Sequence, residues 1–261
     1  LALSDFSIQL RPKPEMSSGQ VLCRTEAITV GAGQRAGLRG SASYTGAPKV
    51  GDVMGGSGIA KVQASDSKEF REGDLVRAPT GWQTYSIHEP ENLTKTDNTI
   101  ASELHLGALG TNGLTAYFGI TDVGKVQNNE TVLISAAAGS VGHLAGQIAK
   151  AKGAKVIGVC GSDAKCSLLV NELGFDAAIN HQSEDFREQL RNAAPNRIDV
   201  FFDNTGGIIL QSALFRMAVG GRIVCCGVAS QYDTSNPAPG PRGVPGLLIN
   251  NRVRMQGFLI F

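Results

Sequence analysis

The stretch TVLISAAAGSVGHLAGQIAKAKGAKVIGVCGSDAK, residues 131–165, decides the fold of this 261-residue chain. Its pattern predicts a short apolar strand, a turn of small residues, a helix with apolar positions three and four residues apart, and a second strand. The step from strand to helix must fall within residues 136–142. This order of elements is typical of a parallel sheet of the dinucleotide-binding type.

The turn of small residues predicts an anion site. Without a Cβ, Gly139 and Gly142 let the backbone turn sharply and approach a pyrophosphate, and the following helix adds unpaired N–H groups and the positive end of its dipole. We therefore expect cofactor contacts from Ala138, Gly139, Ser140, Val141 and Gly142. Ala137 replaces the first glycine of the usual G-x-G-x-x-G pattern, so a plain turn between strand and helix is the alternative.

The end of the second strand predicts which dinucleotide binds. Chains that bind NAD place an acidic residue about 20 residues after the glycines, where it accepts from the ribose 2′-OH. Here the strand ends in Cys160, Gly161 and Ser162. Lys165 brings a positive charge and Ser162 a hydroxyl donor that suit a 2′-phosphate, which predicts NADPH. The alternatives are that Lys165 is a solvated lysine, and that Asp163 is a helix cap or a displaced acidic residue.

Composition and charge argue against two classes of partner. The chain has 24 basic and 23 acidic residues and a net charge of +1, with no Lys/Arg run interleaved with aromatics, so we expect no nucleic acid partner. No apolar run reaches the length of about 20 residues that spans a membrane. The first ten residues, LALSDFSIQL, read as a strand and not as a secretory leader. Because the chain begins with Leu1, a leader that has been removed stays an alternative. We expect a cytoplasmic location.

The cysteines and histidines predict chemistry without a metal. The five cysteines are an odd number, three of them on predicted strands, and we expect them to be reduced: Cys23, Cys160, Cys166, Cys225 and Cys226. None of them forms a C-x-x-C pair, and the four histidines are isolated, so local motifs assemble no tetrahedral zinc site.

The pattern of the chain changes near residue 100. Residues 1–103 alternate short apolar runs with turn clusters and predict an antiparallel β domain. Residues 104–261 alternate strands and helices and predict an α/β fold with a doubly wound parallel sheet. The six strands expected in that sheet are residues 131–135, 155–160, 178–180, 200–203, 222–226 and 254–261.

Five segments carry a resemblance to a known family: GLTAYFGI (113–120), AAAGSVGHLAGQIAK (136–150), GVCGSDAKCSLLVNELGFDAAIN (158–180), FFDNTGG (201–207) and CCGVASQY (225–232). They resemble the zinc-independent medium-chain reductases, and within them the prostaglandin reductases, also described as leukotriene hydroxydehydrogenases or alkenal/one oxidoreductases. The resemblance is greatest to the prostaglandin reductase 2 group and covers nearly the whole chain. It implies a Rossmann-type NADPH-binding domain after a GroES-like β domain.

The resemblance implies NADPH-dependent reduction of a carbon–carbon double bond conjugated to a ketone or aldehyde, as in 15-oxo-prostaglandins or alkenals. Negative charge then develops on the carbonyl oxygen, so this chemistry needs a hydrogen-bond donor there more than it needs a nucleophile. The resemblance places Tyr232 beside the nicotinamide as that donor and matches Tyr44 weakly with a tyrosine of the substrate pocket. Without the resemblance, Tyr232 reads as an aromatic covering a loop and Tyr44 as part of a surface turn.

The same resemblance implies further contacts with the cofactor. They involve Asn204, Gly206, Cys226, Gly227, Val228, Phe258, Leu259 and Ile260. His181 stands where the family has a tyrosine that helps to hold the 2′-phosphate, and it can donate a hydrogen bond. Asn204 as a helix cap and Phe258 as core filling are the alternatives.

The chain departs from the family at several further points, which include Thr111 and Asn112 in place of Met-Pro. Gly31, Ala32 and Gly33 replace an Asp-Pro-Tyr sequence, so we expect the substrate side of the β domain to be altered and more flexible. The chain stops at Phe261, where relatives continue. If it is the whole molecule, its last strand leaves an apolar sheet edge, which predicts a homodimer through that edge. A quinone reductase and a non-catalytic, truncated or structural NADPH-binding relative are the alternative functions.

Overall fold

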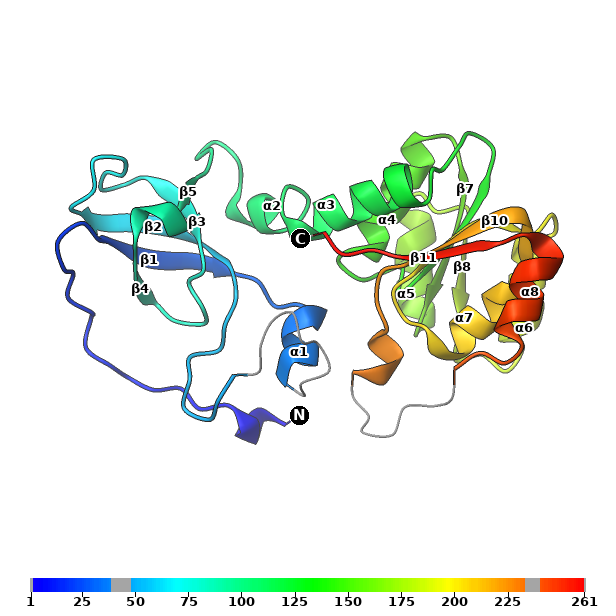
Figure 1. The fold of residues 1–261 in the computed structure, drawn as a ribbon, viewed down its shortest axis with the longest axis horizontal. Coiled ribbons are helices and arrows are strands. Elements are labelled where there is room, and N and C mark those ends of the chain that lie inside the picture. The colour runs from blue at the N-terminus through cyan, green and yellow to red at the C-terminus, as the bar shows by residue number, and fades with distance from the viewer. Residues whose placement is uncertain (1, 39–47, 233–239, 261) are drawn as a thin grey trace. The chain divides into compact units, whose positions relative to one another are not determined.

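The computed structural model describes residues 2–38, 48–232 and 240–260. The chain divides into two compact units, Leu1–Gly110 and Thr111–Phe261. The domain boundary predicted after residue 103 falls inside a short helix of the first unit, α2 (Ser102–Leu106). Each unit has the fold expected from its sequence pattern (Figure 1).

The first unit contains a five-stranded antiparallel sheet in the order β4-β1-β2-β3-β5. Its strands are β1 (Val21–Ile28), β2 (Gly58–Ser65), β3 (Leu75–Ala78), β4 (Tyr85–His88) and β5 (Thr94–Lys95). One face buries a small core that includes Val21, Val62 and Val76. The stretch at Gly31 that was expected to be more flexible leads into a helix, α1 (Ala32–Leu38), and the Gly31 N–H donates to Gln34 Oε1 at 2.6 Å.

The prediction of a strand at the start of the chain is wrong. Residues 2–10 contain only a 3-10 turn, Leu3–Asp5. The side chains of Leu3, Ile8 and Leu10 are almost fully exposed, and no neighbouring strand pairs with this segment. Alternating apolar residues form a strand only where a sheet edge and a core accept them.

The second unit contains a six-stranded parallel sheet in the order β11-β10-β9-β6-β7-β8, which confirms the doubly wound Rossmann-type prediction (Figure 1). Its strands are β6 (Thr131–Ser135), β7 (Lys155–Cys160), β8 (Ala177–Asn180), β9 (Ile198–Asp203), β10 (Met217–Cys225) and β11 (Arg254–Gly257). The strand order reverses between β6 and β9. Folds of this kind bind ligands at that point, beyond the carboxyl ends of the strands.

Helices cover both faces of this sheet. They are α3 (Thr111–Phe118), which continues into a π-turn at Gly119–Val123, α4 (Gly142–Ala151), α5 (Asp163–Asn171), α6 (Phe186–Ala193), α7 (Gly207–Leu214) and α8 (Val244–Asn251). Val132 and Ile134 pack on one face with α3, α4 and α5, and Leu133 packs on the other with α6, α7 and α8. This alternation along β6 buries the central strands on both sides, as a parallel sheet requires.

β6 and β7 have the predicted bounds, the bounds of β8 and β9 differ by one or two residues, and those of β10 and β11 differ most. β10 begins at Met217 and not at Arg222, because the strand continues through a register shift in which Gly220 adopts φ +79°. The two glycines there read as a turn in the sequence. β11 ends at Gly257 and not at Phe261, because Phe258 leaves the sheet and its ring packs edge-on against Phe202, 6.4 Å between ring centres.

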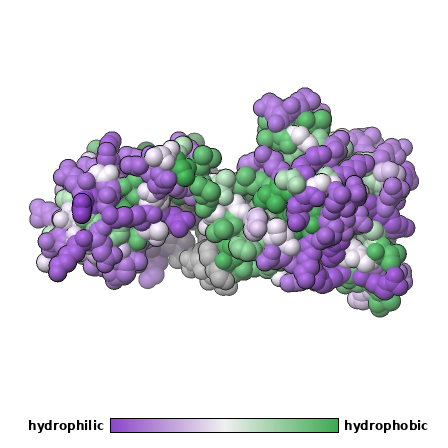
Figure 2. All heavy atoms as spheres, turned by 90° about the horizontal axis from the view of Figure 1, so that it is seen from above, coloured by the Kyte–Doolittle hydropathy of each residue, from purple (hydrophilic) through white to green (hydrophobic). Residues whose placement is uncertain are grey.

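The described part of the chain contains no helix long and apolar enough to cross a membrane. In the view of Figure 2 hydrophilic residues cover much of the surface of each unit, and hydrophobic residues reach the surface in several places. Those with large exposed side chains include Leu109, Phe215 and Ile249.

Candidate functional site

Hydrogen bonds join the carboxyl ends of β6 and β9 at the switch point. The Ser135 hydroxyl donates to Asp203 Oδ1 at 2.8 Å and accepts from the Asn204 N–H at 2.8 Å. The Asn204 side-chain amide donates to the Ser135 carbonyl, also at 2.8 Å. Asn204 therefore bridges two strands and does not cap the helix that follows. Asp203 and Ser135 are both buried.

Asp203 also shapes the turn that follows β9. Its Oδ1 accepts from the Thr205 N–H at 2.9 Å, the Thr205 hydroxyl at 3.1 Å and the Gly206 N–H at 2.9 Å. Gly206 has φ +67°, a conformation that L side chains rarely adopt. Ser135 and Asp203 were not among the site residues predicted from the sequence. The available signal was an acidic residue closing an apolar strand directly before the turn residues Asn204 and Thr205.

We expect Asp203→Ala to lower the free energy of unfolding by about 3 kcal/mol, because it leaves several buried donors without an acceptor. It should also weaken NADPH binding through the turn at Gly206. Asp203→Asn keeps one oxygen acceptor of similar shape and should cost clearly less. Urea unfolding and fluorescence titration with NADPH measure both effects. Equal stability of wild type and Asp203→Ala would contradict this role.

The glycine turn between β6 and α4 leaves no room for a side chain at Gly142. A Cβ there would collide with the Ala136 carbonyl oxygen and lie 2.8 Å from Ala137 Cα. The Ala137 methyl, in the place of the first glycine of the usual pattern, faces Gly158 of β7, where a Cβ would approach it to 3.0 Å. Gly158 therefore provides the space that Ala137 takes. The predicted residues Ala138, Gly139, Ser140 and Val141 lie on this turn, before the N-terminus of α4.

The ends of β7 and β8 bring the predicted 2′-phosphate residues together. A Cβ on Gly161 would lie 3.4 Å from His181 Nε2. Ser162 is the N-cap of α5, and its hydroxyl accepts from the Lys165 N–H at 3.4 Å, which leaves the hydroxyl proton free to donate. The Asp163 carboxylate accepts from the Asn180 side chain at 2.9 Å. Asp163 is thus tied to β8, and Ser162, not Asp163, caps the helix.

The Cys166 thiol lies next to this turn and stays protonated. Burial first, and then the neighbouring Cys160, raise the pKa of the Cys166 thiol to about 12. The sulfur atoms of Cys160 and Cys166 lie 3.1 Å apart, and both cysteines are free. Cys166 therefore adds no negative charge beside Ser162 and Lys165.

The turn after β10 is bonded to the turn after β9. The Ala229 N–H donates to the Asn204 carbonyl at 3.1 Å, and the Ser230 hydroxyl donates to the Thr205 carbonyl at 2.6 Å. Tyr232 ends this short turn and is half-buried. The predicted donor Tyr232 is thereby attached to the switch point through residues 229–230.

The other predicted site residues lie after β10, after β11 and, in the case of Tyr44, outside the described residues. Gly227 lies against Asn204, since a Cβ on it would be 3.0 Å from the Asn204 carbonyl oxygen, and the exposed Val228 follows it. Burial first, and then Asp203, raise the pKa of Cys226 to about 12, so Cys226 contributes a neutral thiol. Phe258 packs against the core. Leu259 is exposed and Ile260 half-buried, and Tyr44 lies outside the described residues.

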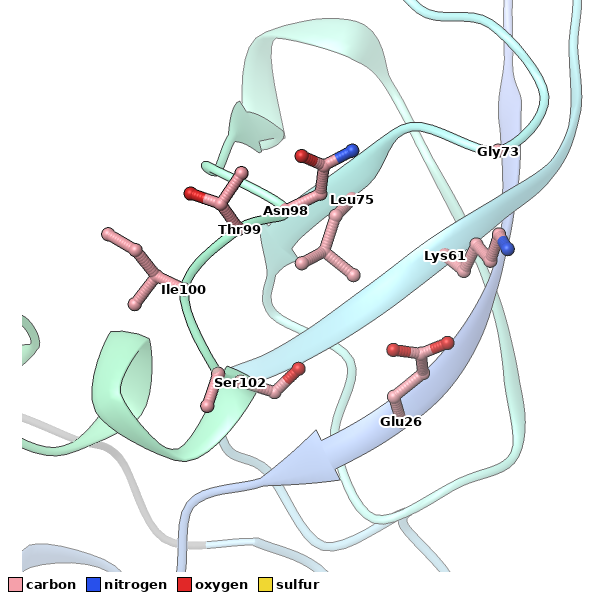
Figure 3. Close-up of a pocket in the computed structure, with 9 residues that line it drawn as sticks. Glu26, Lys61, Gly73, Leu75, Asn98, Thr99, Ile100 and Ser102 are labelled. Carbon is pink, nitrogen blue, oxygen red and sulfur yellow. The ribbon is translucent and has the colours of Figure 1, made fainter.

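A pocket of about 510 Å³ in the first unit holds none of these residues (Figure 3). Glu26 of β1 and Lys61 of β2 line it together with residues 98–102, and all lie within the first unit. Its open, polar lining lacks the glycine cradle found at the ends of the parallel strands.

A doubly wound sheet with a glycine turn at its switch point, together with a separate antiparallel β unit, defines a two-domain oxidoreductase that binds a dinucleotide. A family model described as zinc-binding dehydrogenase matches residues 140–261, and one described as N-terminal domain of oxidoreductase matches residues 1–96. The chain belongs to the medium-chain dehydrogenase/reductase family, in its prostaglandin reductase branch. The closer resemblance to the prostaglandin reductase 2 group stays a prediction.

Three similar proteins illustrate this relationship. Prostaglandin reductase 1 of Bos taurus is 40% identical over 99% of this chain and 77% of its own length. NADPH-dependent curcumin reductase of Escherichia coli is 37% identical over 93% of this chain and 71% of its own length. The crystal structure of CurA in complex with NADPH from Vibrio vulnificus superposes with a TM-score of 0.94 at 34% identity, over 100% of this chain and 79% of that one. The chain thus spans about three quarters of the length of these proteins.

The zinc in the family model's description finds no matching set of ligands here. Across residues 2–38, 48–232 and 240–260, no three His, Cys, Asp or Glu side chains lie close enough together to hold a metal ion. Cys225 and Cys226 are neighbours in the sequence, and burial raises the pKa of both thiols above the ordinary value.

Proposed function

We propose that this protein reduces the carbon–carbon double bond of conjugated enones and enals, such as 15-oxo-prostaglandins or alkenals, with NADPH as the reductant. The main observation in its support is a set of hydrogen bonds between the segments after β6, β9 and β10. These bonds attach Tyr232 to the switch point. The names of the prostaglandin and curcumin reductases support the substrate class, since curcumin is itself a conjugated enone.

The residues present fit NADPH. The turn at Gly139 and Gly142 and the N-terminus of α4 suit the pyrophosphate, because backbone N–H groups and the helix dipole face it. Ser162, Lys165 and His181 suit the 2′-phosphate, as one hydroxyl, one ammonium and one imidazole donor. When bound, NADPH supplies the hydride that reaches the β-carbon of the acceptor.

The side chains of this chain stabilise the charge that develops during the reduction. As the double bond is reduced, negative charge develops on the carbonyl oxygen of the substrate. The phenol of Tyr232 donates a hydrogen bond to that oxygen, and this interaction is stronger in the transition state than in the ground state. A proton from water then adds to the α-carbon, which restores the carbonyl group and gives the saturated compound.

Replacing Lys165 with alanine should raise KM for NADPH by about tenfold, the effect of losing one charge-assisted hydrogen bond. KM for NADH should change little, because NADH has no 2′-phosphate. Lys152→Ala removes a similar charge from an exposed position after α4 and serves as the control. Steady-state kinetics with both cofactors gives the two KM values. If Lys165→Ala raised KM for NADPH and for NADH equally, Lys165 would not bind the 2′-phosphate.

Initial rates on an enone and on a quinone separate the proposed function from its alternatives. Both substrates accept hydride from the same donor. Faster NADPH oxidation with the enone supports the proposal, and faster oxidation with the quinone supports a quinone reductase. Tight NADPH binding without turnover of either compound supports a non-catalytic relative.

We also propose a homodimer formed through β11. This strand lies at the edge of the sheet, its four residues are exposed, and Met255 adds an apolar side chain. An unpaired strand edge is a template for another strand. Sedimentation at micromolar concentration should give the mass of a dimer, and Met255→Lys should shift it towards monomer, whereas Ile249→Lys on α8 should not. A monomeric wild type would exclude this arrangement.

We further propose that the protein works in the cytoplasm, because all five cysteines are free thiols in the structure, including a pair whose sulfur atoms are 3.1 Å apart.

A further inference from the structure

A cavity of about 520 Å³ lies between α6 and α7 of the second unit, apart from the turns described above. Its lining comes from the middle of α6 and from the C-terminal end of α7 with the residues that lead into β10. The C-terminal end of α7 leads into β10, so this part of the lining lies towards the amino ends of the strands. The candidate cofactor residues lie at the carboxyl ends.

Three arginines line this cavity: Arg187, Arg191 and Arg216. None of them forms an ion pair with a carboxylate in the described part of the chain, where the ion pairs involve Lys95, Lys150 and Arg222. The Arg216 side chain donates one hydrogen bond, to the Ala194 carbonyl at 2.6 Å. Burial first, and then Arg197 and Arg191, lower the pKa of Arg216 from its ordinary value. The lining thus concentrates positive charge without a counter-ion from the protein.

Two buried polar atoms of the lining residues have no hydrogen-bond partner within the described part of the chain. They are the Ser212 hydroxyl and Arg216 Nε. Buried polar groups in folded proteins are nearly always paired. These two atoms have almost no exposed surface, so a ligand reaches them only if the lining moves, and its direct contacts fall to the exposed side chains of Arg187 and Arg191. An oxyanion offers several acceptor oxygens and also balances the charge of the arginines.

The rest of the lining is the polar Gln211 and the apolar Leu190 and Phe215. Leu190 forms part of the buried core, while the Phe215 side chain is 56% exposed. The exposed ring of Phe215 lies beside the three arginines and can pack against the hydrophobic part of a ligand. The volume is within the range of cavities that bind small organic molecules.

We propose that the cavity between α6 and α7 binds a small organic anion that combines one carboxylate or phosphate head with an aromatic or aliphatic body. The head lies among Arg187, Arg191 and Arg216, and the body covers Phe215. This site is independent of the candidate cofactor site, and it does not rest on the proposed reductase activity.

Isothermal titration of the protein with 2-naphthoate and with 2-naphthyl phosphate, in excess NADPH, tests this proposal. We expect saturable binding of one equivalent of at least one anion, and no binding of the neutral analogue 2-naphthamide. Arg191→Gln and Arg187→Gln should each weaken binding by about tenfold, the effect of one lost charge-assisted bond. Comparison of the two anions identifies the preferred head group.

Lys152→Gln, the same change of charge at an exposed position after α4, is the matched control and should leave anion binding unchanged. NADPH affinity should be equal in the wild type and in all three variants, which separates this site from the cofactor site. The proposal is overturned if neither anion binds, if the amide binds as tightly as the anions, or if both arginine variants bind like the wild type.

Discussion

Replacing Gly142 with alanine is expected to lower the free energy of unfolding by about 3 kcal/mol and to abolish NADPH binding. The added Cβ has no space, because it collides with the Ala136 carbonyl oxygen and crowds Ala137 Cα at 2.8 Å. Backbone atoms cannot move aside as the end of a flexible side chain can, so the turn must open. Opening it displaces the N–H groups at the start of α4 that the pyrophosphate needs. Urea unfolding and NADPH fluorescence measure the two effects.

Gly246→Ala is the matched control for this prediction. Gly246 lies inside α8, where a Cβ would meet no atom within 4 Å. Alanine in a helix interior is favoured over glycine by about 0.5–1 kcal/mol, so this variant should be as stable as the wild type or slightly more so. If Gly142→Ala behaved like Gly246→Ala, the tight turn would not be required for the fold or the cofactor site.

Replacing Tyr232 with phenylalanine should lower kcat for an enone by about 100-fold or more, the usual effect of removing one donor to a developing oxyanion. KM for NADPH should change little, because the ring stays and only the hydroxyl is lost. The residual rate reflects positioning and hydride supply. Stopped-flow measurement of NADPH oxidation separates the chemical step from product release.

Tyr117→Phe controls for loss of a phenol elsewhere. Tyr117 lies on α3, is half exposed and packs edge-on against Phe118 at 5.4 Å between ring centres. Its variant should have the turnover of the wild type. Unchanged turnover in Tyr232→Phe as well would remove Tyr232 from the mechanism and leave the donor to another group.

The sequence was sufficient to predict the fold of the second unit because its strands are strongly apolar and are bounded by polar or small residues. β6 and β7 have the bounds expected from the pattern. The start of β10 was missed because Gly220 and Gly221 read as a turn, although the strand passes through them with a register shift. The segment at Ile8 and Leu10 shows the opposite error, since local alternation cannot reveal that no strand edge is available.

The candidate site was predictable where it is local and not where it depends on the order of the strands. The turn at Gly139 and Gly142 is a short motif with a physical cause, so its position could be predicted from the sequence alone. The bonds of Ser135 with Asp203 and Asn204 join residues 68 or 69 positions apart, and they become visible only when β6 and β9 are neighbours. Whether the predicted residues contact NADPH remains a prediction.

The most direct test of this account is product analysis after incubation of the purified protein with an alkenal and NADPH deuterated at the transferred position. We predict a saturated aldehyde that carries the deuterium on its β-carbon, with the carbonyl intact, because hydride is delivered to the end of the conjugated system. An unsaturated alcohol labelled at the former carbonyl carbon, or an unchanged alkenal in the presence of bound NADPH, would contradict the proposed function.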